Sequence, residues 1–131
     1  MHRSMKVGTP IVALTTILLG ACSADLVPLP RSGDSTSTID YCVEGGVGVS
    51  VKNTGNSNAA PSTMTVRFPV GAPVDIATPA VEEGQTADLP PIPIPAGCFT
   101  PDCGFKITAD SHGEVPEGNE NNNESTGICV G

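Results

Sequence analysis

Apolar and polar residues alternate along most of this chain after residue 38. Val47, Val49 and Val51 are separated by small or charged residues, a period of two that is typical of a half-buried strand. Similar short segments recur further along the chain, at 63–68, 74–76, 80–81, 86–89, 105–110 and 128–130. Turn-forming residues such as those of 53–56 separate them. The pattern predicts a series of short strands.

Composition agrees with an all-β fold. The chain has 15 glycines and 13 prolines, which interrupt every window long enough for a helix. About seven short strands, with a turn roughly every 8–12 residues, are typical of an antiparallel β-sandwich. We therefore expect one sandwich domain over residues 39–131.

The N-terminus has the parts of an export signal. His2, Arg3 and Lys6 precede an apolar run of about a dozen residues, shorter than the ~20 that a membrane-spanning helix needs. Leu18–Cys22, with the sequence LLGAC, resembles a bacterial lipobox. The resemblance implies that residues 1–21 form a signal peptide and that Cys22 carries the lipid. An ordinary secretory peptide with an incidental cysteine is the alternative.

Residues 22–38 are interpreted as a lipidated, flexible tether. Pro28, Pro30, Gly33 and a run of serines and threonines show no apolar period. The destination would be the cell envelope: the outer membrane in a bacterium with two membranes, because Ser23 rather than Asp follows the cysteine, and otherwise the outer face of the cell membrane.

Charge restricts the partners. The net charge of the whole chain is −8, and Arg31, Lys52, Arg67 and Lys106 are the only cationic side chains after residue 21. Without a basic patch, nucleic acid is a poor partner, whereas divalent cations are better ones. One tyrosine, three phenylalanines and no tryptophan leave a thin core, and small domains of that kind usually need covalent staples.

Four cysteines follow Cys22, an even number that predicts two disulfides in an exported chain. Three pairings exist. We favour Cys98–Cys103, which closes a tight turn, together with Cys42–Cys129, which would join the first strand to the last. A four-cysteine zinc site is the alternative, although a close CxxC pair is lacking.

Two stretches resemble the CARDB family, a cell-adhesion-related domain found in bacteria. The first is VKNTGN at 51–56 with VRF at 66–68, and the second is the closing stretch ITADSHGEVPEGNENNN at 107–123. The resemblance covers roughly residues 39–131. It implies an immunoglobulin-like sandwich on a surface protein with a role in adhesion or interaction. The proline-rich stretch 90–103 departs from the family's usual pattern.

The closing stretch is also the densest polar constellation in the chain. Asp110, Glu117, Glu120 and Asn123 are candidate ligands for calcium, because Ca²⁺ takes six to eight hard oxygen ligands from flexible loops. The EF-hand spacing is absent. The alternative is structural, since Asp, Asn and Glu side chains also hold turns by accepting backbone N–H groups.

Catalysis has little support. His112 is the single histidine after residue 21, and neither a nucleophile elbow nor an aromatic-lined sugar cleft is evident. We expect a non-catalytic, lipid-anchored module that presents an interaction surface, through loops or an edge strand, to a protein or surface polymer. A calcium-binding module, a purely structural spacer in an envelope complex and, least favoured, a hydrolase are the alternatives.

Overall fold

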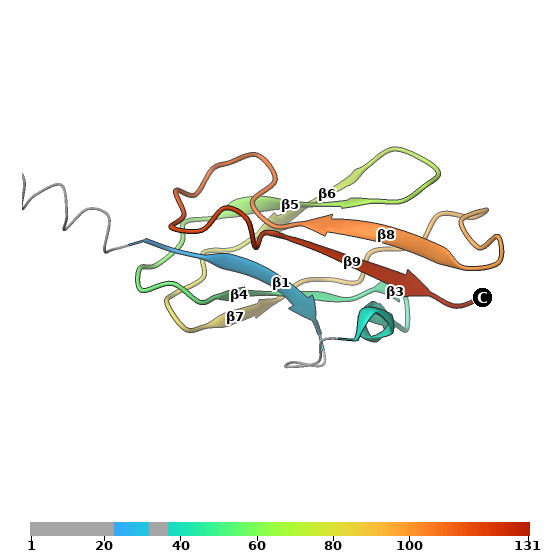
Figure 1. Cartoon of the computed structure of the whole chain (residues 1–131), viewed down its shortest axis with the longest axis horizontal. Coiled ribbons are helices and arrows are strands. Elements are labelled where there is room, and N and C mark those ends of the chain that lie inside the picture. The colour runs from blue at the N-terminus through green and yellow to red at the C-terminus, as the bar shows by residue number, and fades with distance from the viewer. Residues whose placement is uncertain (1–22, 32–36) are drawn as a thin grey trace, which may run out of the picture.

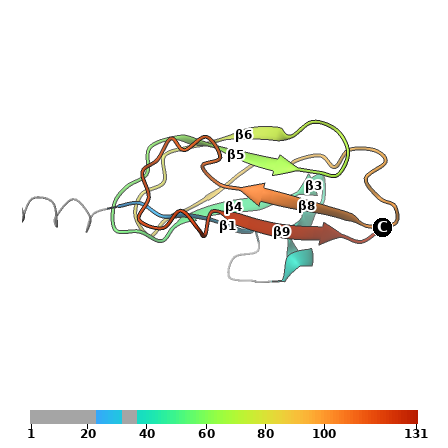
Figure 2. The ribbon, with the colours of Figure 1, turned by 45° about the horizontal axis from the view of Figure 1, so that its top comes forward.

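The computed structural model describes residues 23–31 and 37–131. Within them two antiparallel sheets lie face to face, as Figures 1 and 2 show. The three-stranded sheet has the order β1-β4-β7, and the four-stranded sheet has the order β6-β5-β8-β9. The seven strands of these two sheets confirm the predicted sandwich.

Most of the predicted segments are strands, but 80–81 is not one, because Val81 forms only an isolated bridge with Ala59, and the last strand begins at residue 124 and not at 128. In the three-stranded sheet the strands are β1 Leu26–Pro30, β4 Val49–Asn53 and β7 Thr86–Asp88. In the four-stranded sheet they are β5 Ser62–Arg67, β6 Val74–Thr78, β8 Cys103–Thr108 and β9 Glu124–Cys129. A small hairpin of β2 Cys42–Val43 and β3 Gly46–Val47, with a single 3₁₀ turn η1 Thr38–Tyr41, closes one side.

The core is built mainly from aliphatic side chains of both sheets. Val49 and Val51 of β4 and Met64, Val66 and Ile107 of the opposite sheet are fully buried. Three aromatic rings add to it at one end, where Phe105 packs against Tyr41 and Phe68 with centroids 6.1 and 5.9 Å apart. The apolar residues of the alternating pattern are therefore those on the inward faces of the strands.

The predicted tether is wrong for residues 23–31. Leu26–Pro30 pairs antiparallel with β4 along its whole length, and Leu26 has no exposed surface. The prolines that suggested a linker are tolerated because β1 is an edge strand. Pro28 and Pro30 lie at positions whose backbone polar groups point away from β4, where no N–H is needed for the ladder. Residues 23–31 thus belong to the folded domain, which the sequence had placed at 39–131, while Cys22 lies outside the described residues.

Both predicted disulfides are present. Cys42–Cys129 has its Cα atoms 5.7 Å apart, and Cys98–Cys103 has them 5.1 Å apart. Cys42 lies on β2 rather than on the first strand, so the longer bridge fastens the small hairpin to β9. In the described residues no helix is long and apolar enough to cross a membrane.

Candidate functional site

The two ends of the sandwich differ in chemistry. The end at which residue 23 enters, called here the acidic end, gathers residues 23–25, 54–58, 82–85 and 110–123 (Figure 1). Those segments contain seven of the fourteen acidic residues of the chain. The opposite end, called here the cysteine end, gathers residues 42–46, 93–103 and 129–131. The predicted calcium ligands all belong to the acidic end.

Asp110 begins the closing loop directly after β8. Its backbone is left-handed, with φ of 46°, a conformation that aspartate tolerates better than most residues. Its buried carboxylate accepts the backbone N–H of Glu114 at 2.7 Å and that of Val115 at 3.1 Å. Asp110 therefore holds the turn, as the structural interpretation of the loop predicts.

Glu117 ties the closing loop to the first strand. Its Oε2 accepts the backbone N–H of Leu26 at 2.5 Å, and its Oε1 accepts the side-chain amide of Asn123 at 2.7 Å. Burial raises the pKa of Glu117 to about 7, and its hydrogen bonds from Leu26 and Asn123 offset only part of that effect. The neighbouring Glu120 raises the pKa further, through hydrogen bonding and charge.

The four predicted ligands come together in the fold. Carboxylate oxygens of Asp110, Glu117 and Glu120 lie within 4.8 Å of one another. The amide nitrogen of Asn123 also lies 3.2 Å from Glu120. Three carboxylates at this separation repel one another unless a proton or a cation lies among them. The geometry suits a hard divalent cation, which would be held by carboxylate and amide oxygens.

Several buried oxygens at this end have no hydrogen-bond partner among the described residues. They are Oδ1 of Asn123, whose residue is 7% exposed, and Oδ1 of Asp25 and of Asn122. Asp25 and Asn122 touch through their other atoms, since Asn122 Nδ2 donates to Asp25 Oδ2 at 3.0 Å. Buried oxygens without a donor cost free energy and call for an explanation.

The remaining polar residues of the loop have other roles. Glu114 is exposed, and Asn119 accepts the backbone N–H of Asn121. Sequence reasoning missed Asp25, because it lay in the supposed tether. The sequence carries little signal for it, since Leu26, Val27 and Leu29 do not alternate with polar residues, and the alternating burial of 24–30 is seen only in the structure.

His112 lies on a turn, as predicted, and about half of its side chain is exposed. Its Nε2 is 3.4 Å from Asp75 Oδ2. The neighbouring Ser111 hydroxyl instead contacts Thr65 Oγ1 at 2.6 Å and donates to the carbonyl of Thr63. Because the serine is bonded away from the histidine, the two do not form the nucleophile and base of a hydrolase.

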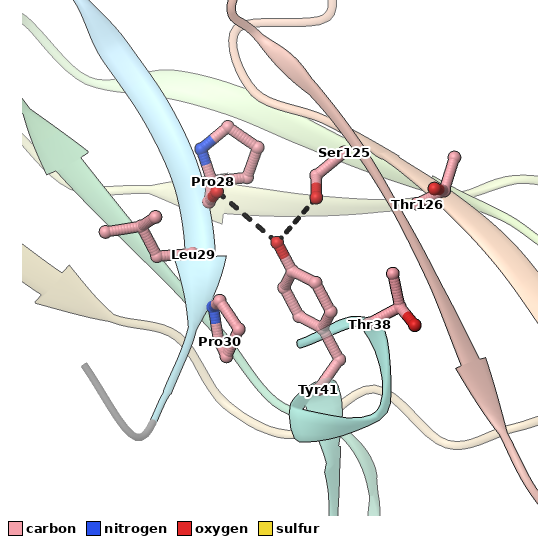
Figure 3. Close-up of a pocket in the computed structure, with 7 residues that line it drawn as sticks. All are labelled: Pro28, Leu29, Pro30, Thr38, Tyr41, Ser125 and Thr126. Carbon is pink, nitrogen blue, oxygen red and sulfur yellow. Dashed lines mark hydrogen bonds between the residues drawn. The ribbon is translucent and has the colours of Figure 1, made fainter. Parts of the chain in front are cut away.

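A cavity of about 350 Å³ separates β1 from β9, as Figure 3 shows. The Tyr41 hydroxyl points into it and donates to Ser125 Oγ at 2.7 Å, with the Pro28 carbonyl 3.4 Å away. Burial raises the pKa of Tyr41, and its hydrogen bond with Ser125 acts in the opposite direction. Sequence reasoning did not single out this tyrosine, whose hydroxyl bridges the edges of the two sheets.

At the cysteine end, a more open groove of about 470 Å³ is lined by apolar side chains and by polar groups of the backbone. Phe99 is 43% exposed and Val130 is 71% exposed, and the Cys42–Cys129 bridge lies beside them. Val43, Pro93 and Ile94 complete the apolar lining. Exposed apolar side chains gathered in one groove are more informative than single ones scattered over a surface.

Two solved structures are similar to this chain, and the one with the higher TM-score has the same fold. The solution structure of a domain (residues 272–376) of a protein described as a cell surface protein of Methanosarcina acetivorans is 20% identical to this chain. The match has a TM-score of 0.62 and covers 82% of this chain and 91% of that one. A CARDB domain from Pyrococcus furiosus, crystallised in complex with di-metal ions, is also 20% identical. That match has a TM-score of 0.45 and covers 82% and 88% of the two chains.

No curated protein matches the chain. The CARDB family model matches residues 23–127, so the match begins where the described fold begins and includes β1. This span begins 16 residues before the 39–131 that the sequence resemblance suggested and ends four residues before it. It contains the turn after β4, the acidic closing loop and most of β9. The chain therefore belongs to the CARDB family of adhesion-related, non-enzymatic domains.

Proposed function

We propose that this protein is a lipid-anchored envelope module that presents a non-catalytic interaction surface at its cysteine end. The observation that carries the proposal is the difference between the two ends of the sandwich. The chain enters at the acidic end (Figure 1). The groove with Phe99 and Val130 belongs to the cysteine end. A lipid on Cys22 would hold the acidic end near the membrane and turn the apolar groove away from it.

Ser23, the first described residue, is held by hydrogen bonds and would restrict the movement of such an anchor. The Ser23 N–H donates to Asn56 Oδ1 at 3.0 Å, and the Ser23 carbonyl accepts the Asn56 N–H at 3.1 Å. A lipidated Cys22 would therefore be adjacent to an ordered residue, with no tether between them. The expected role is a domain seated at the membrane surface, in place of the flexible reach that the sequence suggested.

Strand addition at β1 is disfavoured as the mode of interaction. Its outer edge offers no free N–H group, because Pro28 and Pro30 have none and the N–H of Leu26 is bonded to Glu117. A partner is therefore not expected to add a strand at β1, and the proposal places it at the groove. The apolar side chains there suit a protein or an apolar surface polymer.

Site-specific photo-crosslinking in intact cells tests this proposal. A crosslinker at position 99 should capture a discrete partner, whereas the same group at Glu83, on the acidic end, should not. Replacing Phe99 by serine should weaken the capture by a crosslinker at Val130 without shifting the melting temperature, since Phe99 is partly exposed. Capture of nothing from position 99 would favour the spacer alternative.

Anchoring is tested separately. Radiolabelled palmitate should label the wild-type protein, and the Cys22→Ser variant should remain unlabelled and leave the membrane fraction. A variant that changes Cys42 and Cys129 to alanine serves as a control, because it removes a disulfide and leaves Cys22 in place. An unlabelled wild-type protein would overturn the anchor and favour the ordinary secretory peptide.

Binding of a divalent cation, preferably calcium, is a second function that we propose for the acidic end. It is favoured by the convergence of Asp110, Glu117 and Glu120, with the buried Asn123 between the two glutamates. The Asn123 oxygen without a partner would become a ligand if its amide turned over.

Thermal unfolding in Ca²⁺ and in EDTA tests the cation. A concentration one hundredfold above Kd stabilises by about 2.7 kcal/mol, a shift that melting curves resolve easily. Glu120→Gln should abolish the shift, and Glu114→Gln, an exposed acid of the same loop, should keep it. Equal melting temperatures in the two conditions would refute a cation at this site.

A further inference from the structure

The first strand is fastened by the same side chains that form the candidate cation cluster. In β1, backbone groups alternate between those that face β4 and those that face outward. Leu26 supplies the one outward N–H of this strand, since Pro28 and Pro30 have none. That N–H donates to Glu117 Oε2, so the outer edge of β1 depends on this carboxylate.

The other oxygen of Glu117 faces the cluster. Oε1 accepts the amide of Asn123, whose nitrogen also lies 3.2 Å from Glu120. Asn123 is 7% exposed, and its Oδ1 has no partner among the described residues. The nitrogen of this amide faces both carboxylates, and turning the amide over would point the unsatisfied oxygen at the same place. That buried oxygen is an observation independent of the acidic side chains, and it points to a missing ligand.

The closing loop meets the start of β1 at two further points. The N–H of Gly118 donates to the Ala24 carbonyl at 3.3 Å, and Asn122 Nδ2 donates to Asp25 Oδ2 at 3.0 Å. Three successive residues, 24–26, are thus each bonded to the loop, and the loop in turn contains Glu117, Glu120 and Asn123. Any change that orders the loop would also order the first strand.

We propose that a divalent cation at Asp110, Glu117 and Glu120 acts as a clasp that fixes β1 to the closing loop. This inference rests on the proposed cation site. A bound cation screens the repulsion between the carboxylates, so Glu117 is held where its Oε2 accepts the Leu26 N–H. The loop then holds residues 24–26 in place. Without the cation, the strand detaches more readily from the edge of its sheet.

The position of the clasp suits it to resist a pull on the first strand. Residue 23 leads directly into β1, so tension on the chain from its N-terminal side reaches this strand first. The strand has only β4 beside it in its sheet, and its other edge is secured by Glu117. A cation at the cluster therefore sets how firmly the domain resists extraction of its first strand.

Amide hydrogen exchange on the full chain tests the clasp. In EDTA, the Leu26 amide should exchange about tenfold faster than the Val51 amide of β4, because β1 opens locally. In Ca²⁺ the two amides should exchange at similar rates, since β1 then opens only when the whole domain unfolds. Comparing the ratio of the two rates separates this local effect from a general gain in stability.

Variants sharpen the test. Glu117→Gln keeps an oxygen for the Leu26 N–H but loses the charge, so the ratio should no longer respond to Ca²⁺. Glu120→Gln, at an exposed position, provides the same test should the first variant fail to fold. Glu114→Gln should respond as the wild type does.

The two proposals fail in different ways. A Ca²⁺-dependent melting temperature with an unchanged ratio of Leu26 to Val51 exchange would overturn the clasp and leave the cation site standing. A melting temperature that ignores Ca²⁺ would overturn the cation site, and the clasp with it.

Discussion

The two disulfides should differ in what they contribute to stability. Cys42–Cys129 joins residues 87 positions apart, and Cys98–Cys103 joins residues 5 apart. In the chain-entropy account, loops of these lengths give about 4.6 and about 2 kcal/mol. Replacing Cys42 and Cys129 by alanine should therefore cost roughly twice as much as replacing Cys98 and Cys103. The loss of side-chain packing makes this difference smaller. Cys98 and Cys103 are both buried, whereas Cys42 is exposed, so the short-bridge variant loses more packing.

Urea unfolding of the two double variants measures the difference. With a slope of about 1.5 kcal/mol per molar urea, the midpoint should fall by about 3 M without the long bridge and by about 1.3 M without the short one. The short-bridge variant is the matched control, since each variant lacks two sulfur atoms and one bond. Equal losses, or a larger loss for the short bridge, would refute the claim that the long bridge compensates for a thin core.

Three further results are expected. Burial raises the pKa of Glu117 to about 7, so between pH ~4.5 and about 7 the native state keeps a proton that the unfolded state has lost. The stabilisation from this proton is fully present below pH ~4.5 and is lost as the pH rises through about 7. In EDTA, the free energy of unfolding of the wild type relative to that of Glu117→Gln should therefore fall over that range. Gly46→Ala should destabilise by more than about 2 kcal/mol, since its Cβ would lie 2.0 Å from a backbone carbonyl, whereas Gly84→Ala, whose Cβ would meet nothing within 4 Å, should cost about 1 kcal/mol in urea unfolding. Tyr41→Phe should cost about 1–2 kcal/mol in the same assay, because Ser125 loses its hydrogen bond, and an unchanged midpoint would remove Tyr41 as a link between the sheets.

Period-two alternation was sufficient to predict most of the sandwich. Val49, Val51, Val66 and Ile107 are buried where the pattern places them, because a strand that covers a core on one face must alternate. The first strand was missed for a physical reason. Prolines usually indicate linkers. Pro28, however, lies at a position of the edge strand whose N–H would face away from β4, so the ladder loses no hydrogen bond.

The candidate site was predictable in its residues and only partly in its connections. Oxygen-bearing residues spaced over one short loop can converge, and Asp110, Glu117, Glu120 and Asn123 do so. The bond from the Leu26 N–H to Glu117 joins residues 91 positions apart and depends on the register of β1. The spacing of residues within the loop carries no information about that register. The hydrogen bond between the loop and the strand could therefore be found only in the structure.

The intact mass of the protein purified from its own membrane tests the central claim most directly. The account predicts a chain that begins at Cys22, carries acyl mass on that residue and is lighter by four hydrogens because both disulfides are formed. A chain without acyl mass, or one with its cysteines reduced, would contradict an anchored and covalently stapled envelope domain.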